Sequence, residues 1–599
     1  MNLSNYFGLK KIHGPSLLLL IIPLILCAVT HIWNPVGFPF GPSNDEGIYM
    51  RRAMHVLKGL GPQESSLYDH PYFSQLFLAG ALGLIGYPHI LNPSPDDVHS
   101  VETLWLVPRI LMGLLAVVDT FLIYKISNLY YNRKVAFVAS ILFAVMPISW
   151  FIRRIWLEPI QLPFLLASIL FAVYSKRSSV ISIPRPKHIK NIIIILLSGI
   201  FLGLAIFTKI PAFTMIPLVG FLIYTNTRTR GLKSLGFWFI PVIIIPLIWP
   251  LYALSIGHFD LWWKGAVWQS HRGPNTLFSS FLYDLNIDPL FTTLAIAGLI
   301  FAAIKRDFFL LLWLIPFVIF LYVIGFVSFW HFTPILPAAC VAAARMIEFL
   351  SNKISSNNTK IRQIWSPYVI ISGIGLFGLI TSCIIIAGSN NSTFIGASAF
   401  ANQFLEHYPS GGNNSNTSRL IAVISNPFYL WIPQYVFHFN GWYSGYYDRL
   451  PSADGNILLI VDASFKDVLN RHDDTKQVQK NFGLYTRNDK IAMFQGTEPR
   501  EHVTIYHYSQ TIYFHILNIS NIGSGEDVKF TTTNLATGHY QVYTTRITPA
   551  NNSLSIASLG GFPSGATLIG CMTNLSTQRT SCDDETVATP RIDFYVSAR

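Results

Sequence analysis

Long apolar runs, separated by short polar segments, fill about the first two thirds of the sequence. A helix needs roughly 20 apolar residues to cross the hydrocarbon core of a bilayer, and about eleven runs come close to that length. Several are short or interrupted by proline, which membrane helices tolerate. The predicted spanning helices cover residues 15–33, 104–126, 135–151, 160–174, 192–208, 210–224, 236–256, 290–304, 308–327, 335–350 and 368–388.

The composition agrees with this pattern. Hydrophobic residues make up 51% of the 599 residues, and charged residues make up only 12%. Soluble domains carry about 25% charged residues. We therefore expect an α-helical polytopic membrane protein.

Lysine and arginine are concentrated in every second loop between the predicted helices, as at Lys134, Arg306 and Lys353. Cytosolic loops carry such an excess, so we expect a cytosolic N-terminus and, after an odd number of helices, an extracytoplasmic tail. The protein would then lie in the cell membrane, or in the ER membrane of a eukaryote. This bias also explains much of the net charge of +12, which needs no nucleic acid as a partner.

Beyond the last predicted helix the sequence becomes rich in Asn, Ser, Thr and Gly, and no spanning run follows. We predict a transmembrane domain at 1–388, an extracytoplasmic α/β domain at 389–500 and a β-rich domain at 501–599. The α/β prediction rests on helix-like stretches that alternate with short apolar strands, and the β-rich prediction on short β-branched runs. Cys571 and Cys582 share the tail and are candidates for a disulfide in an oxidising exterior.

An acidic pair follows shortly after the first predicted helix. It opens the stretch DEGIY at residues 45–49, and YDHP follows further on at residues 68–71. This segment resembles the first external loop of the GT-C glycosyltransferases, the class of protein O-mannosyltransferases and aminoarabinose transferases. Members of that class take a sugar from a polyprenyl-phosphate donor.

The resemblance implies roles for several residues of this loop. Asp45 stands where the class has its catalytic carboxylate and is expected to act as general base, with Glu46 binding the acceptor or positioning the loop. Tyr49, Asp69 and His70 are expected in the substrate pocket. One alternative is open, because Asp45 is also a good N-cap for the helix that follows.

A second charged group lies between the third and fourth predicted helices. Glu158 follows Arg153 and Arg154 there, in a stretch similar to one where the family has an arginine, several apolar residues and an aspartate. The resemblance makes Glu158 a catalytic candidate and the two arginines candidates for binding the donor phosphate. Snorkelling of the arginines to lipid headgroups is the alternative.

Arg109, Lys209 and His331 complete the candidate site. Arg109 stands in VPRIL, similar to a family stretch whose arginine faces the active site, and guanidinium suits phosphate recognition. Lys209 ends GLAIFTK, close to the family signature G-L-x-x-x-T-K, and a lysine at this depth needs an anion; an interfacial anchor is its alternative role. His331 precedes a Leu-Pro pair in a similar family stretch and is placed in the substrate pocket, although a lone histidine is more often structural.

Together these residues predict an integral-membrane, inverting glycosyltransferase of GT-C type. It would move mannose or a similar sugar from a polyprenyl- or dolichyl-phosphate donor to a protein, glycan or lipid acceptor on the extracytoplasmic side. The segment 260–288, rich in tryptophan and cations, is a candidate lid over the lipid donor. A divalent cation is a candidate cofactor, but the carboxylates offer no defined ligand set.

Three other functions suit a charged polytopic membrane protein. A transporter or flippase of a lipid-linked or anionic solute would carry charges near the bilayer midplane and repeated halves, whereas here the acids cluster on one side and no repeat is visible. A subunit like an oligosaccharyltransferase would carry W-W-D-Y-G, which GWYSGYYD at residues 441–448 does not match. An inactive paralogue that scaffolds a transferase is the third alternative.

Overall fold

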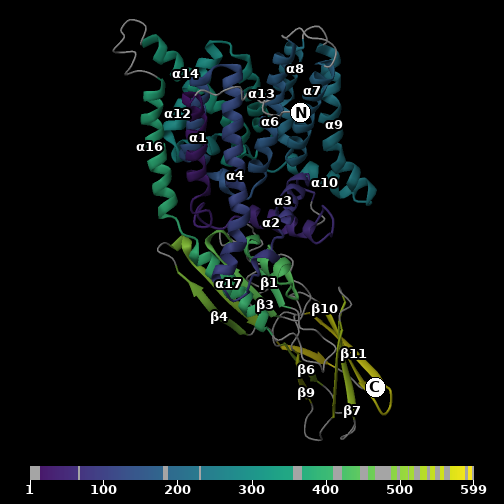
Figure 1. The fold of residues 1–599 in the computed structure, drawn as a ribbon. Coiled ribbons are helices and arrows are strands. Elements are labelled where there is room, and N and C mark those ends of the chain that lie inside the picture. Colours follow the sequence, from purple (N-terminus) through teal and green to yellow (C-terminus); the bar gives the residue numbers. More distant parts are fainter. Residues whose placement is uncertain are drawn as a thin grey trace. The chain divides into compact units, whose positions relative to one another are not determined.

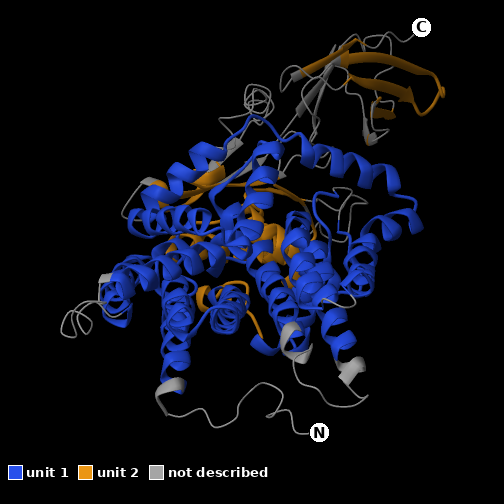
Figure 2. Cartoon of the chain, turned by 90° about the horizontal axis from the view of Figure 1, so that it is seen from above, with its two compact units in different colours: residues 1–40, 52–91, 102–391 blue, residues 41–51, 92–101, 392–599 orange. Residues whose placement is uncertain are grey.

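A computed structural model describes residues 14–64, 68–179, 187–227, 231–354, 367–408, 421–445, 456–465, 487–495, 499–509, 512–517, 527–535, 540–546, 553–558, 567–586 and 591–595. The chain divides into two compact units (Figure 2). Unit 1 comprises Met1–Phe40, Arg52–Leu91 and Glu102–Asn391. Unit 2 comprises Gly41–Arg51, Asn92–Val101 and Ser392–Arg599.

Every apolar run predicted to be a spanning helix is helical, in places with a break. Proline stands in the first turn of the 3₁₀ helix η3 (Pro147–Arg153) and of helix α8 (Ile216–Asn226), close to such breaks. Proline is well tolerated in the first turn of a helix but not in its interior. The remaining long helices are α1 (Gly14–Ile32), α4 (Val98–Tyr130), α5 (Arg133–Val145), α6 (Leu157–Ser179), α7 (Lys187–Thr208), α9 (Gly231–Ser255), α12 (Pro289–Ile304), α13 (Phe308–Ile324), α14 (Leu336–Ile354) and α16 (Pro367–Gly388).

The lengths of these helices limit how many can span a membrane alone. By length and composition, six helices of the described chain can do so, or up to eight if each of two bent pairs is one span. One such pair is α12 with α13, bent by 118°. The predicted number of about eleven also includes shorter apolar helices, such as α1 and α8, that do not pass this test.

Unit 1 is held together by pairs of neighbouring helices. Helix α7 packs against α6 and α9 (Figure 1). Helix α5 packs against α1, α14 and α16. Trp105, Trp238 and Trp313 are almost completely buried, so the largest side chains fill the spaces between helices. Such dense packing is what holds helices together in lipid, where apolar burial alone gives little drive.

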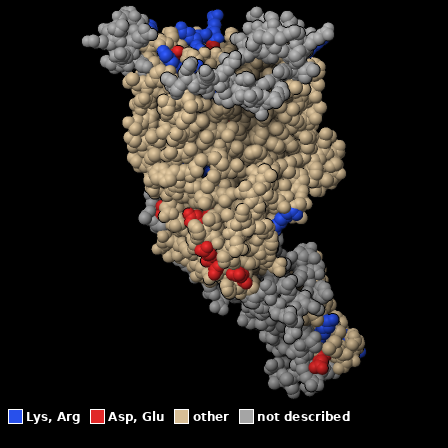
Figure 3. Space-filling model, in the orientation of Figure 1, with Lys and Arg blue, Asp and Glu red and all other residues tan. Residues whose placement is uncertain are grey.

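At one end of unit 1, hydrogen bonds join the segment between α4 and α5 to the start of α13 and to the last turns of α14. Tyr131, after α4, donates a hydrogen bond of 2.9 Å to Asp307, before α13. Asn132 donates one of 2.9 Å to Glu348 near the end of α14. Three of the segments that the positive-inside pattern placed on one side therefore lie together, and Figure 3 shows Lys and Arg at one end of the molecule beside a broad band of uncharged surface. That this end is cytosolic stays a prediction.

Unit 2 contains a mixed sheet. Strands β2 (Gly441–Ser444), β1 (Ile421–Ile424) and β3 (Asn456–Val461) are parallel, and β5 (Val503–Ser509) and β4 (Arg487–Phe494) continue the sheet antiparallel in the order β2-β1-β3-β5-β4. All residues of β1 are buried, as expected for a central parallel strand. Helix α17 (Ser392–His407) packs against β4 and β5.

Two further sheets of unit 2 contain the last strands described. Phe530 of β7 and Phe594 of β12 are fully buried, with ring centroids 5.6 Å apart, so the two sheets pack through these aromatic rings. The orders are β11-β10-β7-β8 and β12-β6-β9. The strands are β6 (Ile512–Leu517), β7 (Asp527–Asn534), β8 (Tyr540–Arg546), β9 (Ser553–Ser558), β10 (Thr567–Asn574), β11 (Thr580–Thr586) and β12 (Arg591–Tyr595).

Two sequence-based expectations for the tail can be compared with these sheets. The disulfide between Cys571 and Cys582 is confirmed, and it joins directly opposed residues of β10 and β11. The boundary drawn at residue 500 would assign β5 to the β-rich domain, but β5 pairs with β3 and β4 of the mixed sheet.

Gly47 tests how tightly the start of α2 (Asn44–Leu57) is packed within unit 2. A Cβ atom at this position would collide with the main chain of Pro427 and Phe428. We expect Gly47→Ala to lower the free energy of unfolding by about 1–3 kcal/mol, as overpacking does. Denaturant titration in detergent would measure the loss.

The matched control is Gly80→Ala in α3 (Phe73–Leu84), where an added Cβ meets no atom within 4 Å. This change should be neutral or stabilise by up to about 1 kcal/mol, because alanine favours the helix. Equal stabilities for the two variants would contradict the close contact at Gly47.

Candidate active site

A cavity of about 650 Å³ lies in unit 1. Apolar side chains of α9 and α13, among them Val242, Trp249, Phe317 and Leu321, form much of its wall. A polar part of the wall comes from segments far apart in the sequence. Its residues include Asp69, His70, Glu158, Gln161, Lys209, Arg272 and His331.

The polar wall is centred on an ion pair between Glu158 and Lys209. Glu158 stands in the first turn of α6, and Lys209 is the extended residue that follows α7. Lys209 Nζ donates a hydrogen bond to Glu158 Oε1, and the two residues are only 8% and 3% exposed, respectively. Gln161 Nε2 donates to the carbonyl oxygen of Lys209 at 2.6 Å and so fixes the main chain at the end of α7.

Asp69 and His70 approach the cavity from the segment before α3. Arg52 Nη2 donates to Asp69 Oδ1 at 2.7 Å, and the same oxygen accepts the His70 main-chain N–H at 3.0 Å. Burial alone would raise the pKa of Asp69, but attraction to Arg52 and His70 and these hydrogen bonds together hold the pKa below its ordinary value. The Asp69 carboxyl is therefore a fixed negative charge.

The His70 imidazole is held in its neutral form. Burial is the largest cause and lowers the pKa of His70 to about 3; the nearby Asp69 opposes this shift, whereas Lys209, Arg52 and Arg272 add to it by repulsion. A neutral imidazole retains one nitrogen that can accept a hydrogen bond. The cavity therefore offers an acceptor beside its cations.

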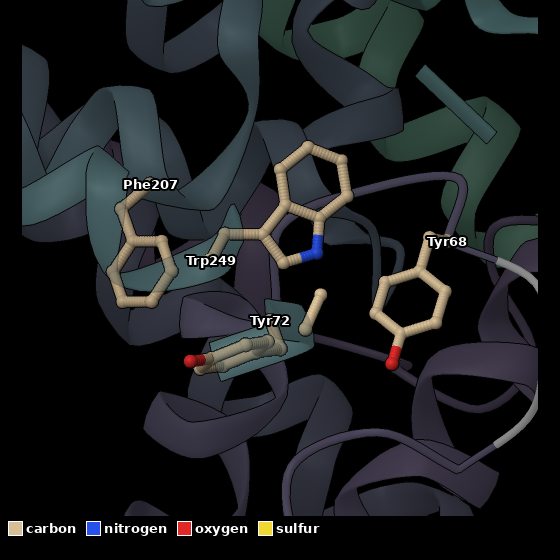
Figure 4. Packing of buried hydrophobic residues seen from close by; sticks show 5 residues of the cluster. Tyr68, Tyr72, Phe207 and Trp249 are labelled. Carbon is tan, nitrogen blue, oxygen red and sulfur yellow. The ribbon is translucent and has the colours of Figure 1, made fainter. Parts of the chain in front are cut away.

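An aromatic cluster holds the Asp69–His70 segment in place. Tyr68 and Tyr72 flank that segment and pack with Phe207 of α7 and with Trp249 of α9 (Figure 4). Helix α10 (Phe259–Ser270) also approaches closely, because a Cβ on Gly265 would collide with the Tyr68 carbonyl. Packing on both sides thus fixes where the charged side chains can lie.

His331 and Arg272 lie on the wall formed by η6 (Phe329–Ile335) and the segment after α10. The Ser328 main-chain N–H donates to His331 Nδ1 at 2.9 Å, so the imidazole also caps the turn. The Arg272 guanidinium is 4.8 Å from the ring centroid of Trp268 and 4.7 Å from that of Phe326. These rings hold a cation at the cavity without a carboxylate contact to it in the described chain.

The three arginines that the sequence proposed for phosphate binding contact main-chain carbonyl groups instead of lining the cavity. Arg109 donates to the carbonyls of Pro35 and Val36, each at 3.0 Å. Arg153 donates to the carbonyls of residues 30, 33 and 34, and Arg154 donates to the carbonyl of residue 40. All three are at most 6% exposed and none lines the cavity. They fix the chain that leaves α1, and phosphate binding by them stays only a prediction.

Asp45, Glu46 and Tyr49 lie in the first turns of α2 and belong to unit 2, whereas the cavity is lined by residues of unit 1. Glu46 and Tyr49 are buried, and Asp45 is partly exposed. Helix α2 begins at Asn44, so Asp45 stands inside its first turn, where the helix macrodipole favours a negative charge. This position suits both the catalytic and the helix-capping interpretation.

The structure adds cavity residues that the sequence motifs did not identify. Gln161 follows Glu158 by one helical turn, and Arg272 lies in the segment 260–288 that was proposed as a lid without a residue-level role. Arg52 is the partner of Asp69. In the described part of the chain no three His, Cys, Asp or Glu residues form a group suited to a metal ion, and the need for a divalent cation stays a prediction.

One stretch of the sequence matches a known family. Residues 63–262 match the family model of dolichyl-phosphate-mannose-protein mannosyltransferases, a stretch that includes Asp69, His70, Glu158 and Lys209. No curated protein matches the chain by sequence.

Several solved structures share the fold. One is the oligosaccharyltransferase AglB from Archaeoglobus fulgidus in complex with an inhibitory peptide and a dolichol-phosphate, at 10% identity and a TM-score of 0.51 over 98% of this chain and 99% of that one. The same enzyme tethered to an acceptor peptide gives a TM-score of 0.52 at 10% identity, over 98% and 100%. ArnT from Cupriavidus metallidurans gives 0.50 at 11% identity, over 82% and 98%. At such identities the likeness is one of fold.

The chain has the fold of the GT-C glycosyltransferases, and residues 63–262 match the family model of the mannosyltransferases. It is a multi-pass membrane glycosyltransferase, as the sequence motifs predicted.

The buried pair Glu158–Lys209 can be tested by a double-mutant cycle. Glu158→Gln or Lys209→Met alone should each destabilise the protein by about 3–5 kcal/mol, because each leaves an unpaired buried charge. The double variant should lose much less than the sum, since both charges are gone. Denaturant titration would measure all four proteins, and additive losses would contradict a direct pair.

The neutral state of His70 predicts a dependence of stability on pH. Between the ordinary histidine pKa and about 3, the unfolded chain binds a proton that the folded protein does not. Stability should therefore fall as the pH falls from about 6.5, by at most about 1.4 kcal/mol per pH unit. Denaturant titration between pH 5 and pH 7 stays above the range in which Asp69 titrates.

His70→Gln should reduce the slope of stability against pH by up to about 1.4 kcal/mol per pH unit, the contribution of one imidazole. His89→Gln, at an exposed position, should leave the slope unchanged. Equal slopes in wild type and His70→Gln would show that His70 does not contribute to it.

Proposed function

We propose that this glycosyltransferase moves mannose or a similar sugar from a polyprenyl- or dolichyl-phosphate donor to an acceptor on the extracytoplasmic side of the membrane. The observation that carries the proposal is the cavity of unit 1, which joins a long apolar wall to a group of cations and acids. A lipid phosphate has the same division into an apolar chain and a charged head.

The apolar wall suits the donor's hydrocarbon chain. Pro246 and Pro250 of α9 face Phe317 and Leu321 of α13 across the cavity, so the polyprenyl chain would meet a surface that has few groups requiring hydrogen bonds. The match to a protein solved with a dolichol-phosphate supports this assignment. The match of residues 63–262 to mannosyltransferases favours mannose as the sugar.

Lys209 and Arg272 are the candidates for holding the donor phosphate. Lys209 is paired with Glu158, and an entering phosphate would compete for the same ammonium group. Arg272 offers a guanidinium that lies against aromatic rings. These cations would stabilise the negative charge that develops on the phosphate as its bond to the sugar breaks.

Asp45 is our candidate for the general base, by resemblance to the class. The Asp45 carboxylate would take the proton of the acceptor hydroxyl, the acceptor oxygen would attack the anomeric carbon, and the polyprenyl phosphate would leave. One displacement inverts the anomeric configuration. Glu46 and Glu158 stay catalytic candidates by resemblance to the class, and Tyr49, Asp69, His70 and His331 stay candidates for contacting the substrate.

One observation favours a second candidate, an activity like that of an oligosaccharyltransferase. The likeness to AglB covers 98% of this chain, including its tail. The acceptor would then be a peptide amide and the donor a lipid-linked oligosaccharide. Residues 446–448 of the stretch compared with W-W-D-Y-G lie outside the described residues. Trials with both donor types on peptide, glycan and lipid acceptors would separate these activities.

The decisive experiment is transfer of labelled sugar by the purified protein from synthetic polyprenyl-phosphate donors. Asp45→Asn should lower the rate of transfer by at least about a hundredfold, as loss of a general base does. Asp584→Asn, at an exposed acid of β11, should leave the rate unchanged.

Full activity of Asp45→Asn would remove Asp45 from the mechanism. An inactive wild-type protein that moves lipid phosphate across vesicle membranes would instead identify a flippase.

A further inference from the structure

A second cavity, of about 480 Å³, lies in unit 1 on the other side of α13. Phe317 and Leu321 of α13 face the first cavity, whereas Leu314 and Val318 face the second. Its other walls come from α12, the start of α14 and α11 (Leu277–Ile287). Its volume is in the range of about 300–1,000 Å³ that is typical of sites for small molecules.

One carboxyl group interrupts the apolar lining of this cavity. Asp284 of α11 is only 6% exposed, and its Oδ1 has no hydrogen-bond partner in the described chain. Burial is the cause that raises the pKa of Asp284 to about 7, and no cation in the described part of the chain opposes this shift. A buried polar atom without a partner costs free energy, so such atoms are rare without a reason.

Asp288, one helical turn later, is a carboxyl group with a structural role. Its Oδ1 accepts the Phe291 N–H at 2.9 Å and caps α12, and its Oδ2 accepts the Ile148 N–H at 3.3 Å. Both oxygens are used, and Asp288 does not line the cavity. Asp284 has no comparable task in the fold.

The other polar residues of the cavity wall are already occupied. Asn275 Nδ2 donates to the Tyr322 carbonyl at 3.0 Å, and its Oδ1 accepts the Leu277 N–H at 3.0 Å. The Thr292 hydroxyl donates to the main-chain carbonyl of Asp284 at 3.3 Å. Among these groups it is the Asp284 carboxyl that has an oxygen left for a ligand.

The cavity is accessible from the surface of the helical unit. Phe278 and Tyr322, which line it, are 72% and 68% exposed. In a multi-pass membrane protein, exposed apolar side chains at helix ends meet lipid. An occupant would therefore be an amphiphile that enters from the bilayer.

We propose that this cavity binds a membrane lipid whose headgroup carries a primary amine, with the amine on Asp284 and the hydrocarbon against the apolar walls. An ammonium group can donate to the carboxyl oxygen that lacks a partner and supplies the missing positive charge. A quaternary ammonium has no N–H to donate, and a hydroxyl supplies no charge. The site is separate from the donor cavity and its test does not depend on enzymatic activity.

Native mass spectrometry of the full-length protein, exchanged into detergent with lipids of identical chains, would test the proposal. Wild type should retain one phosphatidylethanolamine at least about tenfold more tightly than phosphatidylcholine or phosphatidylglycerol, as expected for a charge-assisted hydrogen bond. Asp284→Leu should lose this preference. Asp288→Asn, the matched loss of a carboxyl outside the cavity, should keep it.

A second variant tests the cavity without changing Asp284, in case Asp284→Leu disturbs the fold. Ala295→Leu narrows the cavity without touching the carboxyl and should weaken retention of the amine lipid by a similar factor. Equal retention of the three lipids by wild type would overturn the proposal, and so would an amine preference that survives in Asp284→Leu. Equally tight phosphatidylglycerol would show a hydroxyl site and would also overturn it.

Discussion

Burying charge in an apolar helical unit is costly unless each charge finds a partner. The ion pair between Glu158 and Lys209 meets that requirement at the point where α6 begins and α7 ends. Because the pair joins these two helix ends, it also fixes the polar wall of the cavity that we propose for the donor. A donor phosphate would compete with Glu158 for Lys209, and the displaced carboxylate would then have to bind a proton or another donor.

The buried arginines follow the same requirement with a different partner. The chain that leaves α1 has no regular structure to bond its carbonyl groups, and Arg109, Arg153 and Arg154 bond them instead. A guanidinium has five N–H groups in a fixed plane, so it can join several carbonyls at once. Carbonyl and phosphate oxygens both accept hydrogen bonds, so an arginine in a sequence motif does not show which of the two it binds. The position of the main chain in the folded protein shows it.

The sequence was most informative where a local pattern decides the structure. Apolar runs of helix length predicted the helices of unit 1, and short motifs identified Glu158 and Lys209, which line one cavity. Pairings between distant segments were not predictable in this way. Strand β5 pairs with β3 across the domain boundary that the sequence placed at residue 500, and Arg52 meets Asp69 because a helix and a loop fold back on each other. Neither contact leaves a local signature.

Helix α13 separates the two cavities of unit 1 and lines both. Protein interiors are densely packed, so a helix with apolar side chains on two cavity walls cannot shift toward one without changing the other. A ligand with unequal affinity for two positions of α13 would therefore change the affinity of the opposite cavity, and thermodynamic linkage makes that effect reciprocal. Helix α13 follows α12 after a short connection, and the two helices are bent by 118° relative to each other. A lipid bound in the second cavity, as we propose, would contact the same helix that lines the cavity proposed for the donor.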